Sequence, residues 1–78
     1  MSRTKEALIK VAKDRLDLEV TDEMIASGKK FKDFGIDSLD TIEMLVSIED
    51  ELDLELDDSK LDEIENIQQL VEYLKEFD

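Results

Sequence analysis

The chain has 78 residues, enough for one small domain, and its 23 acidic and 10 basic side chains give a formal net charge of −13. Such a charge repels nucleic acids and anionic membrane surfaces, so basic proteins are the expected partners. The chain has no Cys and no His, which excludes disulfides, cysteine-based zinc sites and the most common general base.

The apolar segments of the chain are too short for a membrane protein. None approaches the roughly 20 residues that are needed to span a bilayer. The N-terminus also lacks the apolar stretch of a signal peptide. We therefore expect a cytoplasmic protein that is monomeric and has no stable membrane insertion.

The first predicted element is an amphipathic helix from about Thr4 to Asp17. Apolar residues recur in it at helical spacing: Ala7, Leu8, Val11, Ala12 and Leu16. A short turn is predicted at residues 21–26, followed by a loop at residues 29–34. Phe31 and Phe34 are expected to anchor this loop on the core.

Residues 35–40, with the sequence Gly-Ile-Asp-Ser-Leu-Asp, indicate where a second helix begins. Gly35 suits a tight bend. Asp37, followed three residues later by Asp40 at the front of an apolar-periodic run, is typical of a helix start. Ser38 is then in the first turn, where free backbone N–H groups and the helix dipole favour an attached anion such as a phosphate.

The second long helix is predicted from about Ser38 to Asp53. At about 100° per residue its apolar positions cover roughly 220°, more than the stripe of somewhat over 100° that a surface helix needs. The core set of this arc is Met44, Leu45, Ile48 and Leu52, and the edge set is Leu39, Ile42 and Val46, beside Asp40, Glu43 and Asp50. We interpret the edge as a partner surface; the alternative is that all of these apolar residues belong to the core.

Residues 53–57 are predicted to form an extended linker, because two alternating apolar residues make no sheet in a chain otherwise patterned for helix. A short helix should then begin at Asp58 or Ser59. It is expected to contain Leu61 and Ile64.

Asn66 and Gln69 form a capping pair for a final helix. Its inward-facing residues are expected to be Ile67, Leu70, Val71, Leu74 and Phe77. Together the elements predict an all-α fold, a small four-helix bundle of three principal helices and one short helix, with a long loop between the first and second helices. A single domain is expected over residues 1–78.

The motif at residues 35–40, the following Thr-Ile-Glu-Met-Leu-Val at residues 41–46 and the Ile-Gln-Gln-Leu-Val-Glu-Tyr-Leu at residues 67–74 resemble the acyl carrier protein family. The resemblance covers nearly the whole chain and implies a free-standing carrier. It implies that Ser38, the serine of the Asp-Ser-Leu motif, is esterified by phosphopantetheine, which a separate phosphopantetheinyl transferase takes from coenzyme A. The thiol of that arm would carry acyl groups as thioesters to partner enzymes, with fatty acid biosynthesis as the expected pathway.

The resemblance also implies partner enzymes of fatty acid or polyketide synthesis that bear basic docking patches. The residues expected to dock them are Asp37, Leu39, Asp40, Ile42, Glu43, Val46 and Asp50. The residues expected to shelter the acyl chain are Met44, Leu45, Ile48, Leu56 and Ile64.

Other classes of function are less well supported. Without His, Cys or a Gly-rich phosphate loop, an acid–base pair would stand in water with ordinary acidity, so we predict no catalytic residue and no enzyme. The acidic residues 53–58 lack the glycine and the final glutamate of an EF-hand loop, so no metal site is predicted.

Two alternatives stay open. The first is a specialised carrier for polyketide, lipid-modification or aminoacyl chemistry, because Leu56-Asp57-Asp58 stands where the family commonly has Ile-Pro-Asp and the loop at residues 29–32 is unusually basic. The second is an acidic helical adaptor that presents its second helix to a basic partner and is never modified.

Overall fold

The computed structural model describes residues 2–78, and every side chain among them except that of Asp58. The principal helices are α1 (Arg3–Leu16), α3 (Ser38–Leu52) and α5 (Ile67–Leu74), and the short ones are α2 (Asp22–Ser27) and α4 (Asp58–Leu61). Two 3-10 helices, η1 (Phe31–Phe34) and η2 (Lys75–Phe77), complete the regular structure of these residues, which contain no β-strand. The predicted all-α bundle is confirmed, and its long first loop holds α2 and η1.

Polar side chains fix where the helices begin. The Ser2 hydroxyl accepts a hydrogen bond from the backbone N–H of Lys5 at 3.1 Å, so α1 begins at Arg3, one residue before the predicted start. Asp17 takes a left-handed conformation with φ of 52°, which ends α1 one residue before the predicted end. The Thr21 hydroxyl caps α2 in the same way as Ser2 caps α1.

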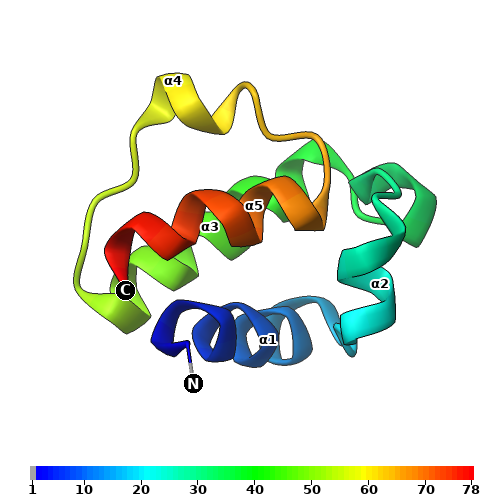
Figure 1. Ribbon diagram of the computed structural model, residues 1–78, viewed down its shortest axis with the longest axis horizontal. Coiled ribbons are helices and arrows are strands. Elements are labelled where there is room, and N and C mark those ends of the chain that lie inside the picture. Colours follow the sequence, from blue (N-terminus) through cyan, green and yellow to red (C-terminus); the bar gives the residue numbers. More distant parts are fainter. Residues whose placement is uncertain (1) are drawn as a thin grey trace.

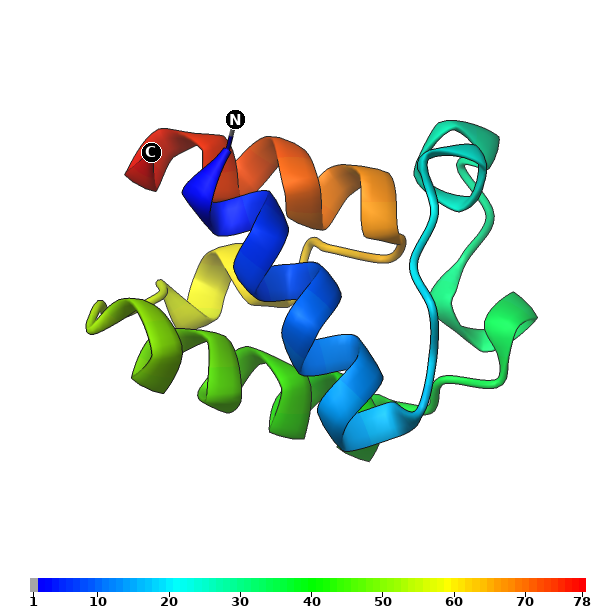
Figure 2. The same ribbon diagram turned by 90° about the horizontal axis from the view of Figure 1, so that it is seen from below.

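The principal helices enclose the core. α1 packs against α3 and α5, and α2 packs against α5. Figures 1 and 2 show α1 on one side of the α3 and α5 pair and α4 on the other. The largest fully buried apolar side chains come from α1, α3 and α5: Leu8, Met44, Ile48, Ile67, Leu70 and Leu74. α4 contributes none of these fully buried side chains, although its Leu61 packs against the core.

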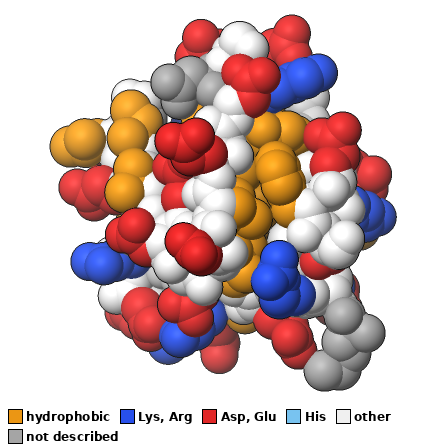
Figure 3. All heavy atoms as spheres, turned by 90° about the vertical axis from the view of Figure 1, so that its left-hand side faces the viewer, with side chains coloured by type: hydrophobic (Ala, Val, Ile, Leu, Met, Phe, Trp, Pro, Cys, Tyr) orange, Lys and Arg blue, Asp and Glu red, His pale blue; other side chains and the backbone are white. Residues whose placement is uncertain are grey.

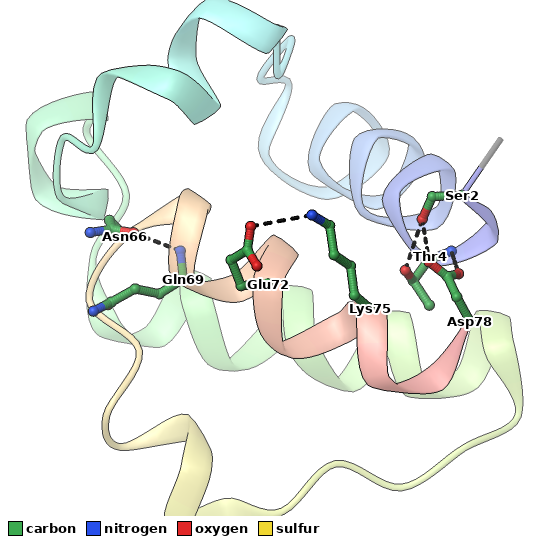
Figure 4. Close-up of polar contacts among 7 residues, drawn as sticks. All are labelled: Ser2, Thr4, Asn66, Gln69, Glu72, Lys75 and Asp78. Atoms are coloured by element: carbon green, nitrogen blue, oxygen red, sulfur yellow. Dashed lines mark hydrogen bonds and ion pairs between the residues drawn. The ribbon is translucent and has the colours of Figure 1, made fainter.

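The two ends of the described chain meet beside α1. The Asp78 carboxylate accepts hydrogen bonds from the Ser2 hydroxyl at 2.7 Å and from the backbone N–H of Thr4 at 3.0 Å (Figure 4). These hydrogen bonds lower the pKa of Asp78 below its ordinary value, the one from Ser2 contributing most. A negative side chain at the start of a helix also interacts favourably with the helix dipole.

The segment at residues 29–34, predicted as a loop, contains the 3-10 turn η1. The Asp33 carboxylate accepts a hydrogen bond from the backbone N–H of Lys30 at 3.1 Å, which favours this turn. The backbone N–H of Phe31 donates to the carbonyl of Glu65 at 3.1 Å and so ties η1 to the segment before α5. Phe31 is buried and Phe34 is partly buried, as expected of residues that anchor this segment on the core.

The connection from α3 to α5 differs from the prediction in one respect. The linker is extended as expected, but α4 ends at Leu61, so Ile64 lies beyond the short helix that was predicted to contain it. The single turn of α4 stops there because residues 62 and 63 form a tighter turn, in which the N–H of Ile64 donates to the carbonyl of Leu61 at 3.2 Å.

The predicted pair of Asn66 and Gln69 caps the start of α5, but one of its two hydrogen bonds has another partner than expected. The Asn66 side chain accepts from the backbone N–H of Gln69 at 2.7 Å (Figure 4). The Gln69 side chain reaches back to the N–H of Glu65, at 2.6 Å, and not to that of Asn66. Both ends of the connection between α4 and α5 are therefore held by hydrogen bonds.

Candidate functional site

Ser38 is the first residue of α3, and its local geometry follows from the two aspartates around it. The Asp37 carboxylate accepts from the backbone N–H of Asp40 at 2.8 Å, and the Asp40 carboxylate accepts from that of Asp37 at 3.4 Å. This reciprocal pair is a capping box. Gly35, with φ of 78°, makes the bend that leads into it.

The Ser38 side chain is available for chemistry. Ser38 is exposed, and its hydroxyl has no hydrogen-bond partner among the residues that the structure describes. The neighbouring hydroxyl of Thr41 donates to the carbonyl of Asp37 at 3.0 Å, so it is occupied. A hydroxyl at this position is free to form a phosphoester, and the first-turn N–H groups of α3 favour the negative charge that such a group brings.

Ser38 stands at the edge of a cavity of about 720 Å³, a volume within the range of about 300–1,000 Å³ typical of small-molecule sites. The apolar part of its lining consists of Phe31, Ile36, Ile42, Leu45, Val46, Leu61 and Ile64. The polar part consists of Lys30, Lys32, Asp37, Ser38, Thr41, Glu49, Asp62 and Glu65. The cavity thus joins η1, α3 and the segment around α4.

The residues predicted to shelter an acyl chain lie in two places. Leu45 and Ile64 are in the lining of the cavity. Met44, Ile48 and Leu56 are buried in the core and are not in that lining. All five stay predictions as shelter residues, and only the first two are placed next to the space that a chain would enter.

The cavity lining also includes side chains that were not among the predicted shelter residues. Phe31, Ile36 and Leu61 come from segments whose positions depend on contacts between distant parts of the chain, such as that between Phe31 and Glu65. The sequence signals were apolar character and position: Phe31 was expected to anchor the first loop on the core, and Leu61 was expected in the short helix.

The predicted edge of the second helix is exposed. The exposed fractions of Leu39, Ile42 and Val46 are 62%, 57% and 51%, so the alternative in which every apolar residue of this helix is core is wrong for these three. Leu52, assigned to the core set, is only partly buried.

Carboxylates accompany this edge. Asp37, Glu43 and Asp50 are exposed and Asp40 is half-buried. On the side of the molecule that carries the linker between α3 and α4, Figure 3 shows many acidic side chains and two separate groups of hydrophobic ones. Exposed apolar side chains bordered by carboxylates are typical of surfaces that bind a basic partner.

The linker between α3 and α4 is held by side chains from both neighbouring helices. The Glu49 carboxylate of α3 accepts from the N–H of Leu56 at 2.9 Å, and the Tyr73 hydroxyl of α5 accepts from the N–H of Asp57, also at 2.9 Å. The Tyr73 ring also packs edge-on against Phe77, with 5.5 Å between centroids. Hydrogen bonds from Ser59 lower the pKa of the Asp57 carboxyl. The polar groups of the linker are therefore largely satisfied.

The described residues contain no cluster of three or more acidic, His or Cys side chains arranged to hold a metal ion. Nor do they contain a helix long and apolar enough to cross a membrane. An exposed, unpartnered hydroxyl at a helix N-terminus and at the edge of an apolar cavity fits a covalently attached phosphate ester with an organic arm. Fold and site together define a small helical domain with an exposed serine hydroxyl beside an apolar-lined cavity.

Comparison with known proteins identifies the family. The family model described as "Phosphopantetheine attachment site" matches residues 6–74, and the chain belongs to that family. The cofactor of the family is phosphopantetheine, as the sequence predicted. The family and the names of the relatives also support a carrier and not a catalyst.

Three curated relatives are acyl carrier proteins of organelles. The chain is 40% identical over 62 residues to "Acyl carrier protein, mitochondrial" of Saccharomyces cerevisiae, covering 78% of this chain and 50% of the relative. It is 34% identical over 73 residues to "Acyl carrier protein SF2, chloroplastic" of Brassica campestris and to "Acyl carrier protein, chloroplastic" of Brassica napus, covering 94% of this chain and 54% of each relative. The predicted resemblance to acyl carrier proteins is confirmed, and the chain spans about half the length of these relatives.

Proposed function

We propose that this chain acts as an acyl carrier protein with phosphopantetheine attached to Ser38, in a domain formed by the whole chain. The observation that carries the proposal is the position of Ser38, an exposed hydroxyl in the first turn of α3 at the edge of an apolar-lined cavity. The family match supports the cofactor, and the Asp-Ser-Leu motif supports this serine as its attachment point.

The side chains around Ser38 have separate roles in this proposal. Asp37 and Asp40 fix the first turn of α3 and leave the serine hydroxyl accessible to a transferase. The thiol of the bound group would supply the chemistry, because it carries acyl groups as thioesters. Phe31, Leu45 and Ile64 exclude water from an apolar chain that enters the cavity, and burial of apolar surface is favourable.

Partner enzymes would dock on the exposed edge of α3. Leu39, Ile42 and Val46 offer apolar area, while Asp40 and Glu43 attract a basic patch. The charge of −13 adds long-range steering towards such partners. A small apolar area with carboxylates around it favours rapid association and release, which a carrier serving several enzymes needs.

The phosphopantetheinyl transferase and the enzymes of fatty acid synthesis are the proposed partners, and fatty acid biosynthesis is the proposed pathway. The names of the relatives as acyl carrier proteins support this choice over an aminoacyl or lipid-modification carrier. The compartment stays a prediction: the sequence led us to expect the cytoplasm, whereas the relatives above are mitochondrial or chloroplastic.

The intact mass of the protein tests the attachment. After incubation with coenzyme A, magnesium and a broad-specificity phosphopantetheinyl transferase, the chain should gain the mass of one phosphopantetheine. Ser38→Ala should not gain it, whereas Ser47→Ala, which changes another serine of α3, should. No gain in any of the three proteins would favour the unmodified adaptor, and a gain in Ser38→Ala would place the attachment elsewhere.

A charge reversal tests the docking surface. Glu43→Lys should lower kcat/KM of the transferase at low salt, and the defect should shrink as salt screens the charges. Glu76→Lys, which makes the same change on η2, an element that packs against α1 and α5, is the matched control. Equal transfer rates for the two variants would contradict docking on α3, provided that their circular dichroism spectra and melting temperatures agree.

A further inference from the structure

We propose that Glu49 determines which acyl chains this carrier can shelter, because its carboxylate ends the apolar part of the cavity. The inference rests on the proposed carrier function. It assigns to Glu49 the role of a specificity-determining residue, and it identifies the preferred cargo as apolar acyl chains short enough to end before Glu49.

Two hollows follow one another along α3. The cavity beside Ser38 is bordered by α3 residues from Ser38 to Glu49. The second hollow, of about 500 Å³, is bordered by α3 from Val46 to Asp53 and by the start of the linker. Val46 and Glu49 belong to both linings, so they form the boundary between the two spaces.

The two hollows differ in chemical character. The lining of the first is largely apolar and continues from α3 to η1 and the α4 segment, with seven apolar side chains beside the carboxylates of Asp37, Glu49, Asp62 and Glu65. The second is lined by the carboxylates of Glu49, Asp50, Asp53 and Glu55 and by only two apolar side chains, Val46 and Leu54. A methylene group that passes Glu49 would leave apolar walls and meet carboxylates, whose desolvation is costly. Burial of an acyl chain is therefore favourable only up to Glu49.

Hydrogen bonds to the linker hold the Glu49 side chain at this boundary. Its carboxylate accepts from the N–H of Leu56 at 2.9 Å, and its backbone carbonyl accepts from the N–H of Leu54 at 3.1 Å. The Leu56 side chain is buried in the core. Moving the Glu49 carboxylate would leave the partly buried N–H of Leu56 without a partner, which is unfavourable.

The test compares melting temperatures of carriers loaded with saturated chains of increasing length. The transferase moves acyl-phosphopantetheine from acyl-coenzyme A to the Ser38 oxygen; the pyrophosphate bond of the coenzyme breaks, adenosine 3′,5′-bisphosphate leaves, and the serine proton goes to solvent. Intact mass verifies each loading. Failure to load would count against the proposed function, whereas loading without the expected length dependence would count against Glu49.

We expect the melting temperature to rise with chain length and then to stop rising. The chain length at which the rise stops is called the break. Each fully buried methylene should add on the order of 3–6 °C, from the burial free energy and the usual scaling for domains of this size. In Glu49→Met the break should move to longer chains, because the boundary residue becomes apolar, although the carboxylates of Asp50, Asp53 and Glu55 still lie beyond it. Glu49→Gln keeps an acceptor for Leu56 and a polar boundary, so its break should stay where it is in the unchanged protein.

Glu55→Met is the matched control, since Glu55 borders only the second hollow. Each variant is compared with its own unloaded form, so a general loss of stability cancels. If Glu49→Met does not fold, amide exchange in the unchanged protein decides: the N–H of Leu56 should stay protected for chains shorter than the break. A melting temperature that keeps rising with length while Leu56 stays protected would overturn the proposal, as would the same break in Glu49→Met and Glu55→Met.

Discussion

Replacing Asp37 by Ala tests whether the capping box holds Ser38 in place. The change removes the 2.8 Å hydrogen bond to the N–H of Asp40 and the negative charge at the start of α3. Loss of an N-cap side chain costs about 1 kcal/mol, within a range of about 0.5–2 kcal/mol. For a domain of this size that free energy corresponds to a fall in melting temperature of about 4–8 °C.

Asp37→Asn separates the effect of the capping hydrogen bond from that of the negative charge. Asparagine caps helices about as well as aspartate but carries no charge. We expect this variant to stay within about 0.5 kcal/mol of the unchanged protein and to keep slow amide exchange at Asp40. Urea unfolding with amide exchange measures both effects. If Asp37→Ala unfolds at the same urea concentration as Asp37→Asn, and Asp40 exchanges equally slowly in both, the capping box does not organise the first turn of α3.

Three further predictions concern stability. Tyr73→Phe removes the acceptor for the N–H of Asp57, which should destabilise the fold by about 1 kcal/mol and speed amide exchange at Asp57; unchanged exchange would contradict the contact. The folded-state pKa of Asp78 is lowered, so its stabilising effect should be complete above the ordinary carboxyl pKa and disappear as the pH falls through the lowered value. Urea midpoints of Asp78→Asn and the unchanged protein should therefore differ near neutral pH and converge in strong acid, and a difference that does not depend on pH would refute this explanation. Magnesium should raise the melting temperature because a charge of −13 repels itself, and a flat or falling melting temperature would count against it.

Local signals in the sequence predicted much of the fold. Capping residues are read from short patterns, and the patterns at Asp37 and Asn66 gave helix starts that agree with the structure. The periodicity of the second helix separated the buried Met44, Leu45 and Ile48 from the exposed edge. These features depend on neighbours in sequence and on helical geometry, so no knowledge of the tertiary arrangement was needed.

The cavity could be predicted only in part, since it is formed by segments that are far apart in sequence. Leu61 and Phe31 lie in segments that are 30 residues apart in the sequence, and the bond from Phe31 to Glu65 ties η1 to the segment before α5. Glu49 was not singled out by any pattern in the sequence. Its place at the boundary of two hollows depends on the path of the linker, which no local pattern specifies.

The hydrogen bonds at the two ends of the α4 segment have a consequence for how the molecule can open. Tyr73 holds this segment at Asp57, and the contact between Phe31 and Glu65 holds it at the other end. Between these points the single turn of α4 contributes none of the fully buried apolar side chains. Swinging the segment outward breaks these hydrogen bonds and exposes Leu61 and Ile64, which pack against the core, but it leaves the fully buried side chains of α1, α3 and α5 in place. Local opening of this segment should therefore cost less free energy than unfolding of the whole domain.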